Sequence, residues 1–296
     1  MSTFMKKMVY GLIGLLAGLA AWPFSETILV FQPYFSSYFV FIIVLGLVFG
    51  ALMGGFLGSS EGITLSVKSR IVPGIIVGMI LGAVGGAVGF WIGQGALWIV
   101  SELVLHSNKL LQAYGIPISR AIGWGFLGVF IGSVEGFRTR SLAKIKVGIA
   151  GGIIGGILGG IALEYFRLHF PDAFFGRLIG SLVLGVLIGL FYGLFEKQFS
   201  KGVLKLLNGT LKGKEFLLLQ NKIRIGSSKK VEIHLPGYEN VADIHAVLKS
   251  KKTDLVVNNV NTEHRVLVNE LNVSEHQLKL DDVIQVGSAK FWFFYK

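Results

Sequence analysis

The sequence predicts a membrane-spanning all-α domain of six helices, followed by an all-β sandwich in about the last eighty residues. Of the 296 residues, 52% are hydrophobic, only 15% are charged and 41 are glycine, a composition typical of integral membrane proteins. The carboxyl-terminal part instead alternates short apolar and polar runs between Gly, Pro, Asn and Asp, which is typical of strands in a sandwich. The strand candidates are residues 222–226, 231–235, 246–249, 283–286 and 291–295.

Six apolar segments are long enough to cross a hydrocarbon core about 30 Å thick. We place them at residues 7–24, 38–57, 71–93, 121–134, 147–166 and 178–195. The first, behind Lys6 and Lys7, also fits a secretory signal peptide. A small-x-small cleavage site does not precede Trp22, and the repeat described next requires this segment as a helix.

Similar sequences recur at the ends of the second, fourth and sixth segments: "GFLGSSEG", "GVFIGSVEG" and the weaker "LFYGLFEK". The first two are each followed by a basic link and a Gly-rich segment, so we expect three helical hairpins related by duplication. Each recurring end carries one carboxylate: Glu61, Glu135 and Glu196. They are candidates for an acidic ring at a cytoplasmic mouth, or for groups that are solvated or paired with the neighbouring Lys and Arg.

Lys and Arg gather at the amino terminus, at the links after the second and fourth segments, and after Lys197. Because cytoplasmic segments carry an excess of these residues, both termini are predicted to be cytoplasmic, with six crossings. The formal charge of +11 therefore indicates membrane topology and not nucleic acid. We expect a bacterial plasma (inner) membrane protein with a cytosolic sandwich.

Glycines recur at spacings of three and four, typical of a glycine zipper in which helix backbones approach closely. The clearest sets are Gly78, Gly82, Gly86, Gly151, Gly155 and Gly159. We expect them to serve helix packing within one chain or between copies. The alternative is that these faces line a pore or slide during transport, but few ionisable groups lie within the apolar segments, and such groups are the usual mark of an ion path.

Two further segments connect these parts. Residues 95–119 show an amphipathic helical pattern suited to the membrane interface. Residues 198–213 form a short basic amphipathic stretch, predicted to be a linker that rests on anionic headgroups or a plain tether. The expected domains are thus residues 1–197 in the membrane, the linker at 198–213, and the sandwich at 214–296.

The order of short motifs in the last domain resembles a forkhead-associated (FHA) domain. The motifs are Ile225-Gly226, Ile233-His234-Leu235-Pro236, Ile244-His245-Ala246, Val268-Asn269, residues 280–287, and Phe291-Trp292-Phe293. The resemblance implies a β-sandwich that recognises a partner protein. It also implies structural roles for Gly226, for His245 as the brace of a loop, and for Asn269.

In FHA domains, phosphothreonine is held by an Arg after the Gly, by a Ser three positions before the His, and by an Asn. The corresponding positions here carry Ser227, Ala242 and His264, so the bidentate guanidinium that suits phosphate is missing. The remaining donors near this loop are Ser227, Ser228, Lys229 and Lys230. We favour protein contact that does not use phosphate over phosphate recognition.

The sequence therefore predicts a membrane adaptor or scaffold whose cytoplasmic FHA-like module binds a cytosolic protein, phosphorylated or not. The alternative is a small channel or transporter regulated by that module. We expect contact with membrane lipid and homo- or hetero-oligomers, and no enzyme activity, cofactor or metal. The chain has no cysteine, its six histidines show no paired metal spacing, and the Gly-x-Gly-x-x-Gly at residues 123–128 lies inside an apolar span instead of after a strand.

Overall fold

The computed structural model describes residues 2–103, 108–170, 172–251, 254–261 and 263–295. Two compact units are present, and each is considered by itself. Residues 4–195 form a helical unit, and residues 196–296 together with the first three residues form the other.

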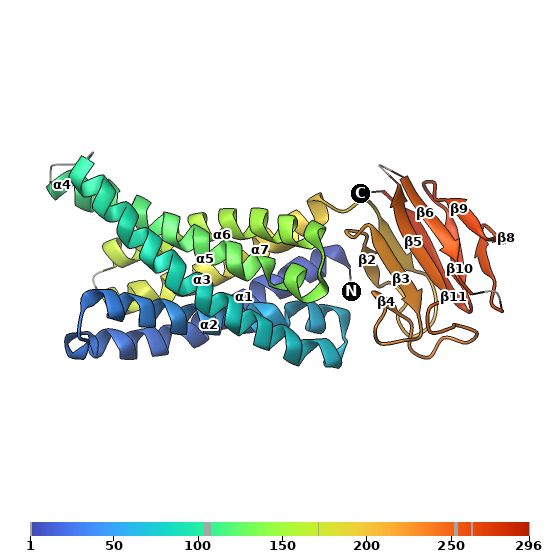
Figure 1. The fold of residues 1–296 in the computed structure, drawn as a ribbon, viewed down its shortest axis with the longest axis horizontal. Helices are drawn as coiled ribbons and strands as arrows, with labels where there is room; N and C mark the ends of the chain where they lie inside the picture. The colour runs from blue at the N-terminus through green and yellow to red at the C-terminus, as the bar shows by residue number, and fades with distance from the viewer. Residues whose placement is uncertain (1, 104–107, 171, 252–253, 262, 296) are drawn as a thin grey trace. The chain divides into compact units, whose positions relative to one another are not determined.

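The helical unit contains the six predicted spans, and each is longer than its apolar segment alone. In the described residues, six helices are long and apolar enough to cross a membrane. They are α1 (Thr3–Val30), α2 (Tyr38–Leu65), α3 (Lys68–Leu103), α5 (Ile116–Thr139), α6 (Leu142–His169) and α7 (Ala173–Gln198) (Figure 1). The six-helix prediction is confirmed.

Residues 95–119, for which we expected one amphipathic interface helix, are divided. Residues 95–103 continue α3, because the apolar run carries the helix past the predicted end. Residues 104–107 lie outside the described residues. A short turn, α4 (Asn108–Leu110), and a π-helical turn, η2 (Leu111–Gly115), then lead into α5.

The links after α2 and α5 have the same geometry. Ser66 and Arg140 follow these helices in the left-handed conformation, with φ of 58° and 51°, and close each helix end with backbone hydrogen bonds. Ser141 then caps α6 by accepting a hydrogen bond from the Lys144 amide. The antiparallel pairs α2/α3 and α5/α6 follow from these tight links.

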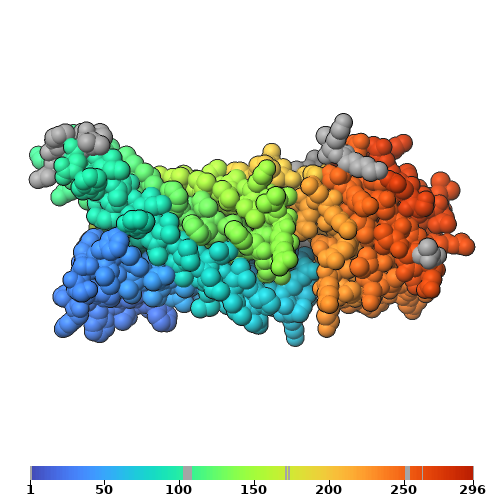
Figure 2. Space-filling view, viewed as in Figure 1, coloured from blue at the N-terminus to red at the C-terminus, as the bar shows by residue number. Residues whose placement is uncertain are grey.

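The glycine stripes lie where helix backbones meet. A Cβ atom on Gly78, Gly82 or Gly86 of α3 would overlap a carbonyl oxygen of α2, and a Cβ atom on Gly151 of α6 would crowd the backbone of α7. Gly155 and Gly159 also face α7, so the six predicted packing glycines all lie against a neighbouring helix of the same chain. Figure 2 shows the surface of α2 and α3, in blue to cyan.

The second unit is a sandwich of two sheets. One sheet has the order β2-β1-β11-β10-β7-β8 and the other β4-β3-β5-β6-β9 (Figure 1). The strands are β1 (Val203–Leu206), β2 (Glu215–Leu217), β3 (Lys222–Gly226), β4 (Ile233–His234), β5 (Ala246–Lys251), β6 (Asp254–Asn259), β7 (Val266–Val268), β8 (Leu271–Val273), β9 (Glu275–Gln277), β10 (Val283–Val286) and β11 (Ala289–Phe294). Alternate residues such as Ile225, Phe291 and Phe293 are fully buried between the sheets.

The segment expected to be a basic linker, residues 198–213, contributes a strand instead. Val203–Leu206 form β1, which pairs antiparallel with β11 on one side and with β2 on the other. Val203, Leu204 and Leu206 are at most 2% exposed. The mixture of basic and apolar residues predicts a linker on anionic headgroups or a tether, but pairing with β11 places the apolar side chains in the core of the sandwich.

Candidate functional site

The loop after β3 corresponds to the phosphate-reading loop of FHA domains, and it is tied to the loop before β5. The Ser227 amide donates to the Ala242 carbonyl at 3.0 Å, and the Ser228 amide donates to the Asp243 carbonyl at 3.3 Å. A Cβ atom on Gly226 would overlap the Asp243 carbonyl oxygen, so the close approach of the two loops requires glycine there.

The serine side chains of this loop make contacts within the chain, and its lysine side chains face solvent. The Ser227 hydroxyl donates to the Asp243 carboxylate at 3.2 Å, and the Ser228 hydroxyl accepts from the Lys230 amide at 3.3 Å. Lys229 and Lys230 are exposed to solvent. Of the four candidate ligand residues, the two serines are therefore engaged within the chain, and a carboxylate stands beside the first.

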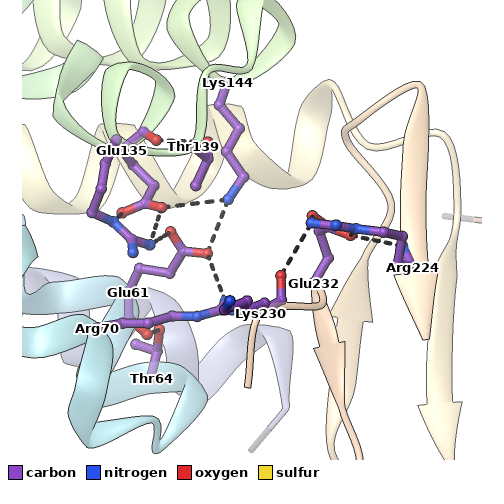
Figure 3. A network of polar contacts seen from close by, with 10 residues as sticks. Glu61, Thr64, Arg70, Glu135, Thr139, Lys144, Arg224, Lys230 and Glu232 are labelled. Atoms are coloured by element: carbon purple, nitrogen blue, oxygen red, sulfur yellow. Dashed lines mark hydrogen bonds and ion pairs between the residues drawn. The ribbon is translucent and has the colours of Figure 1, made fainter. Parts of the chain in front are cut away.

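The nearest arginine on β3 is also engaged. The Arg224 guanidinium binds both carboxylate oxygens of Glu232, at 3.1 Å from Nε and 2.9 Å from Nη2, and its Nη2 donates to the Lys230 carbonyl at 3.0 Å (Figure 3). Burial raises the pKa of the Glu232 carboxyl, but the hydrogen bonds from Arg224 outweigh it and hold that pKa below its ordinary value. Arg224 therefore anchors the strand that follows the loop.

His245 joins two loops from inside the sandwich. Its side chain is fully buried, its Nδ1 accepts from the Ala242 amide at 3.4 Å, and its Nε2 lies 3.1 Å from the Arg265 carbonyl. His264 stacks on it, with 5.5 Å between the ring centroids. Burial lowers the pKa of the His245 imidazole below its ordinary value, so the ring is neutral at neutral pH.

Asn269, in the turn between β7 and β8, is joined to Asp282, which lies directly before β10. Asn269 has a positive φ of 49°, donates to Asp282 Oδ1 at 2.8 Å and accepts from the Val283 amide at 2.9 Å. The other carboxylate oxygen of Asp282 accepts from the Lys279 amide at 2.7 Å and lies 3.1 Å from His276 Nε2.

Two opposing effects act on the Asp282 carboxyl. Burial raises its pKa, but the hydrogen bonds from the Lys279 amide, Asn269 and His276 outweigh it, so the pKa lies below its ordinary value. The sequence indicated a structural role for Asn269 but not its partner. Asp282 stands inside the quoted motif, and only the geometry identifies it as the shared acceptor.

In the helical unit, basic residues bring two of the three recurring carboxylates together. Arg138 Nη2 lies 3.0 Å from Glu61 and binds Glu135, while Lys144 Nζ lies 2.9 Å from Glu61 and 3.6 Å from Glu135 (Figure 3). Arg70 lies 4.0 Å from Glu61. Glu61 and Glu135 are therefore paired in a buried charge cluster, and not exposed in an acidic ring.

The third recurring carboxylate, Glu196, is 5% exposed near the end of α7. The sequence placed Arg138 and Lys144 in a basic link but gave no sign of their partners. Glu61 is 77 positions from Arg138, a distance at which only the packing of α2 against α5 creates the contact.

Together these features define the class of protein: a helical unit of membrane-spanning type joined to a carboxyl-terminal FHA-type β-sandwich. Residues 205–296 match the family described as "Inner membrane component of T3SS, cytoplasmic domain". This match covers the sandwich from within β1 to the end of the chain. The comparison with curated proteins gives no match.

Solved FHA domains resemble the same part of the chain. The FHA domain of CT664 from Chlamydia trachomatis is 20% identical, with 32% of this chain and 97% of that chain covered and a TM-score of 0.30. The FHA1 domain of yeast Rad53 is 15% identical, with 33% and 79% covered and a TM-score of 0.31. An FHA domain from work on phosphothreonine-dependent interactions is 23% identical, with 32% and 96% covered and a TM-score of 0.30.

Proposed function

We propose that this chain is an inner-membrane scaffold whose FHA-type sandwich binds a cytosolic protein partner without needing a phosphate group. In this proposal both termini are cytoplasmic, the helical unit anchors the module and contacts lipid, and copies or partner chains assemble through it. The family matched by residues 205–296 is described as an inner membrane component of a secretion system, which supports a structural role within a multi-protein assembly.

The observation that carries the proposal is the contact between Ser227 and Asp243. Ser227 occupies the position where FHA domains place the phosphate-binding arginine, and its hydroxyl donates to a carboxylate at 3.2 Å. A phosphate brought to this loop would meet the negative charge of Asp243 and would have to break that hydrogen bond. A charge-assisted guanidinium contact, the strongest type of phosphate contact, is missing from this position.

The exposed ammonium groups of Lys229 and Lys230 favour a second candidate, recognition of a phosphorylated or acidic partner. These side chains are flexible point charges, so they attract anions without fixing their geometry. Such a contact would give weak, salt-sensitive binding. The two candidates predict different effects of phosphate on affinity.

The test is titration of the full chain in nanodiscs with a phosphothreonine peptide library and its unphosphorylated twin. We expect equal affinities at physiological salt, and no change in the double variant Lys229→Ala, Lys230→Ala. The double variant Ser227→Arg, Asp243→Ser supplies the missing guanidinium and removes the carboxylate, and serves as the positive control. Phosphate-dependent binding by the unaltered chain, lost when both lysines are removed, would contradict the proposal.

A further inference from the structure

The helical unit holds a cavity near the end where α1 leads into α2. It has a volume of about 330 Å³ and is lined by residues of α1, α2, α3, α5, α6 and α7. Its lining along α2 extends from Tyr38 to Phe49, about 16 Å at the rise of an α-helix. The volume lies at the lower end of the range for small-molecule sites, about 300–1,000 Å³.

The inner part of the cavity is aromatic and aliphatic. Phe41, Leu45, Phe49, Phe90 and Trp124 line it. The rings of Phe49 and Phe90 pack against Trp124 in edge-to-face contacts, with centroid distances of 5.1 and 5.0 Å. These surfaces favour hydrocarbon over water.

The outer part of the cavity is charged. Glu164, whose side chain is 1% exposed, accepts hydrogen bonds from Arg120 and Arg167, both at 2.8 Å. Arg177 binds both carboxylate oxygens of Glu26, at 2.6 and 2.7 Å.

The lining thus holds three guanidinium groups and two carboxylates, a net charge of +1. Each guanidinium carries five N–H donors, more than these contacts occupy. Glu164 lies inside a predicted apolar segment, where a charged group is costly and usually marks a functional site, and the other four charged groups lie within two residues of the ends of such segments.

A further donor lines the same cavity. The indole Nε1 of Trp22 is buried and has no hydrogen-bond partner among the described residues. An indole N–H can only donate, and a buried donor without an acceptor is destabilising. Because this atom has less than 1 Å² accessible to water, a ligand oxygen reaches it only if the Trp22 ring shifts.

We infer that this cavity binds a single-chain amphipathic anion, with its acidic head group at Arg120 and its neighbours and its hydrocarbon chain along the aromatic wall. The net positive charge of the lining favours an acidic head group, and its aromatic and aliphatic surfaces favour a hydrocarbon tail. A volume of about 330 Å³ suits one acyl chain of medium length better than a two-chain lipid. The inference does not depend on the function of the sandwich.

The test uses the full chain in uncharged detergent micelles, with Trp91, Trp98 and Trp292 replaced by Phe. Trp22 and Trp124, which both line the cavity, are then the only tryptophans, and excitation selective for tryptophan reports on them alone. The probe is 12-bromododecanoate, whose terminal bromine quenches tryptophan, and its neutral twin is 12-bromododecanol. The chain has no cysteine to react with the bromide. We expect saturable quenching by the acid, and binding of the alcohol at least about tenfold weaker, since a hydrogen bond to a charged group is worth roughly a factor of ten or more.

Arg120→Gln is expected to weaken binding of the acid about tenfold and to leave the alcohol unchanged. Lys109→Gln removes an exposed charge on α4 and is the matched control, with no effect on either probe. Leu45→Phe narrows the apolar part with every charge in place, so it tests the site even if Arg120→Gln fails to fold, and it should weaken both probes. Equal quenching by acid and alcohol, or acid binding unaffected by Leu45→Phe, would overturn the inference.

Discussion

Removal of the Asp282 carboxylate is the most direct test of how the sandwich is stabilised. Asp282 is 6% exposed and accepts hydrogen bonds from Asn269 and the Lys279 amide, with His276 at 3.1 Å. A hydrogen bond to a charged group contributes about 1.5–3 kcal/mol when buried. Asn269 and Lys279 are exposed enough for water to replace part of each contact, so we take about 1 kcal/mol for each of the three. Asp282→Ala should then lower the free energy of unfolding by about 3 kcal/mol.

Urea unfolding of a fragment spanning residues 196–296, which has its own core, measures this loss. With a slope of about 1 kcal/mol per molar urea for a small domain, the midpoint should fall by about 3 M. Asp281→Asn is the matched control, because Asp281 is exposed and has a φ of 68° that asparagine tolerates. Its carboxylate accepts a hydrogen bond from the Trp292 indole, which the asparagine side-chain oxygen can also accept. Equal midpoints for Asp282→Ala and Asp281→Asn would refute the reasoning.

The same carboxylate predicts a pH dependence. The folded-state pKa of Asp282 lies below its ordinary value of 3.8, so its contribution is present above that value and is lost as the pH falls through the folded pKa. The stability gap between the unaltered fragment and Asp282→Asn should therefore narrow below about pH 4. A gap that stays constant from pH 7 to pH 3 would show that the carboxylate is not held in its charged form.

Three further predictions concern other parts of the chain. Gly82→Ala should lower the stability of the full chain in detergent by about 1–3 kcal/mol, because the added methyl group overpacks against α2. Gly95→Ala, on the same helix with open space around it, should not lower the stability. Equal melting temperatures for the two variants would exclude tight packing at Gly82. Glu61→Gln should cost about 3–5 kcal/mol because it removes one of the two carboxylates that balance the buried Arg138 and Lys144. The exposed Lys68→Gln should stay within about 0.5 kcal/mol in the same melt. The folded pKa of His245 lies below 6.5. The contribution of the neutral imidazole to stability is therefore complete above that pH and is lost as the pH falls toward the folded pKa. The urea midpoint should be lower at pH 5.5 than at pH 7.5, and His245→Asn should reduce that difference.

The local pattern of apolar and polar residues was sufficient to predict the six long helices and several of the strands. The apolar segments are long enough to require helices in a membrane, and in the tertiary structure each helix is longer than its apolar segment. Strands β3 and β10 have the bounds that alternation predicted, at residues 222–226 and 283–286. The glycine spacing marked the helix faces that meet, because only residues without a Cβ permit backbones so close.

Contacts between distant residues were decided by the tertiary structure alone. Val203–Leu206 is a strand only because β11, almost ninety residues later, offers an edge for it to pair with. Glu26 and Arg177 are 151 positions apart, and the packing of α1 against α7 makes them a partly buried pair. The hydrophobic periodicity of a segment indicates the environment of that one helix or strand. The partner of a side chain, its burial and the presence of a cavity depend on how the helices and strands pack together. The sequence therefore predicted a membrane domain and a sandwich, and the packing produced the charge cluster and the cavity.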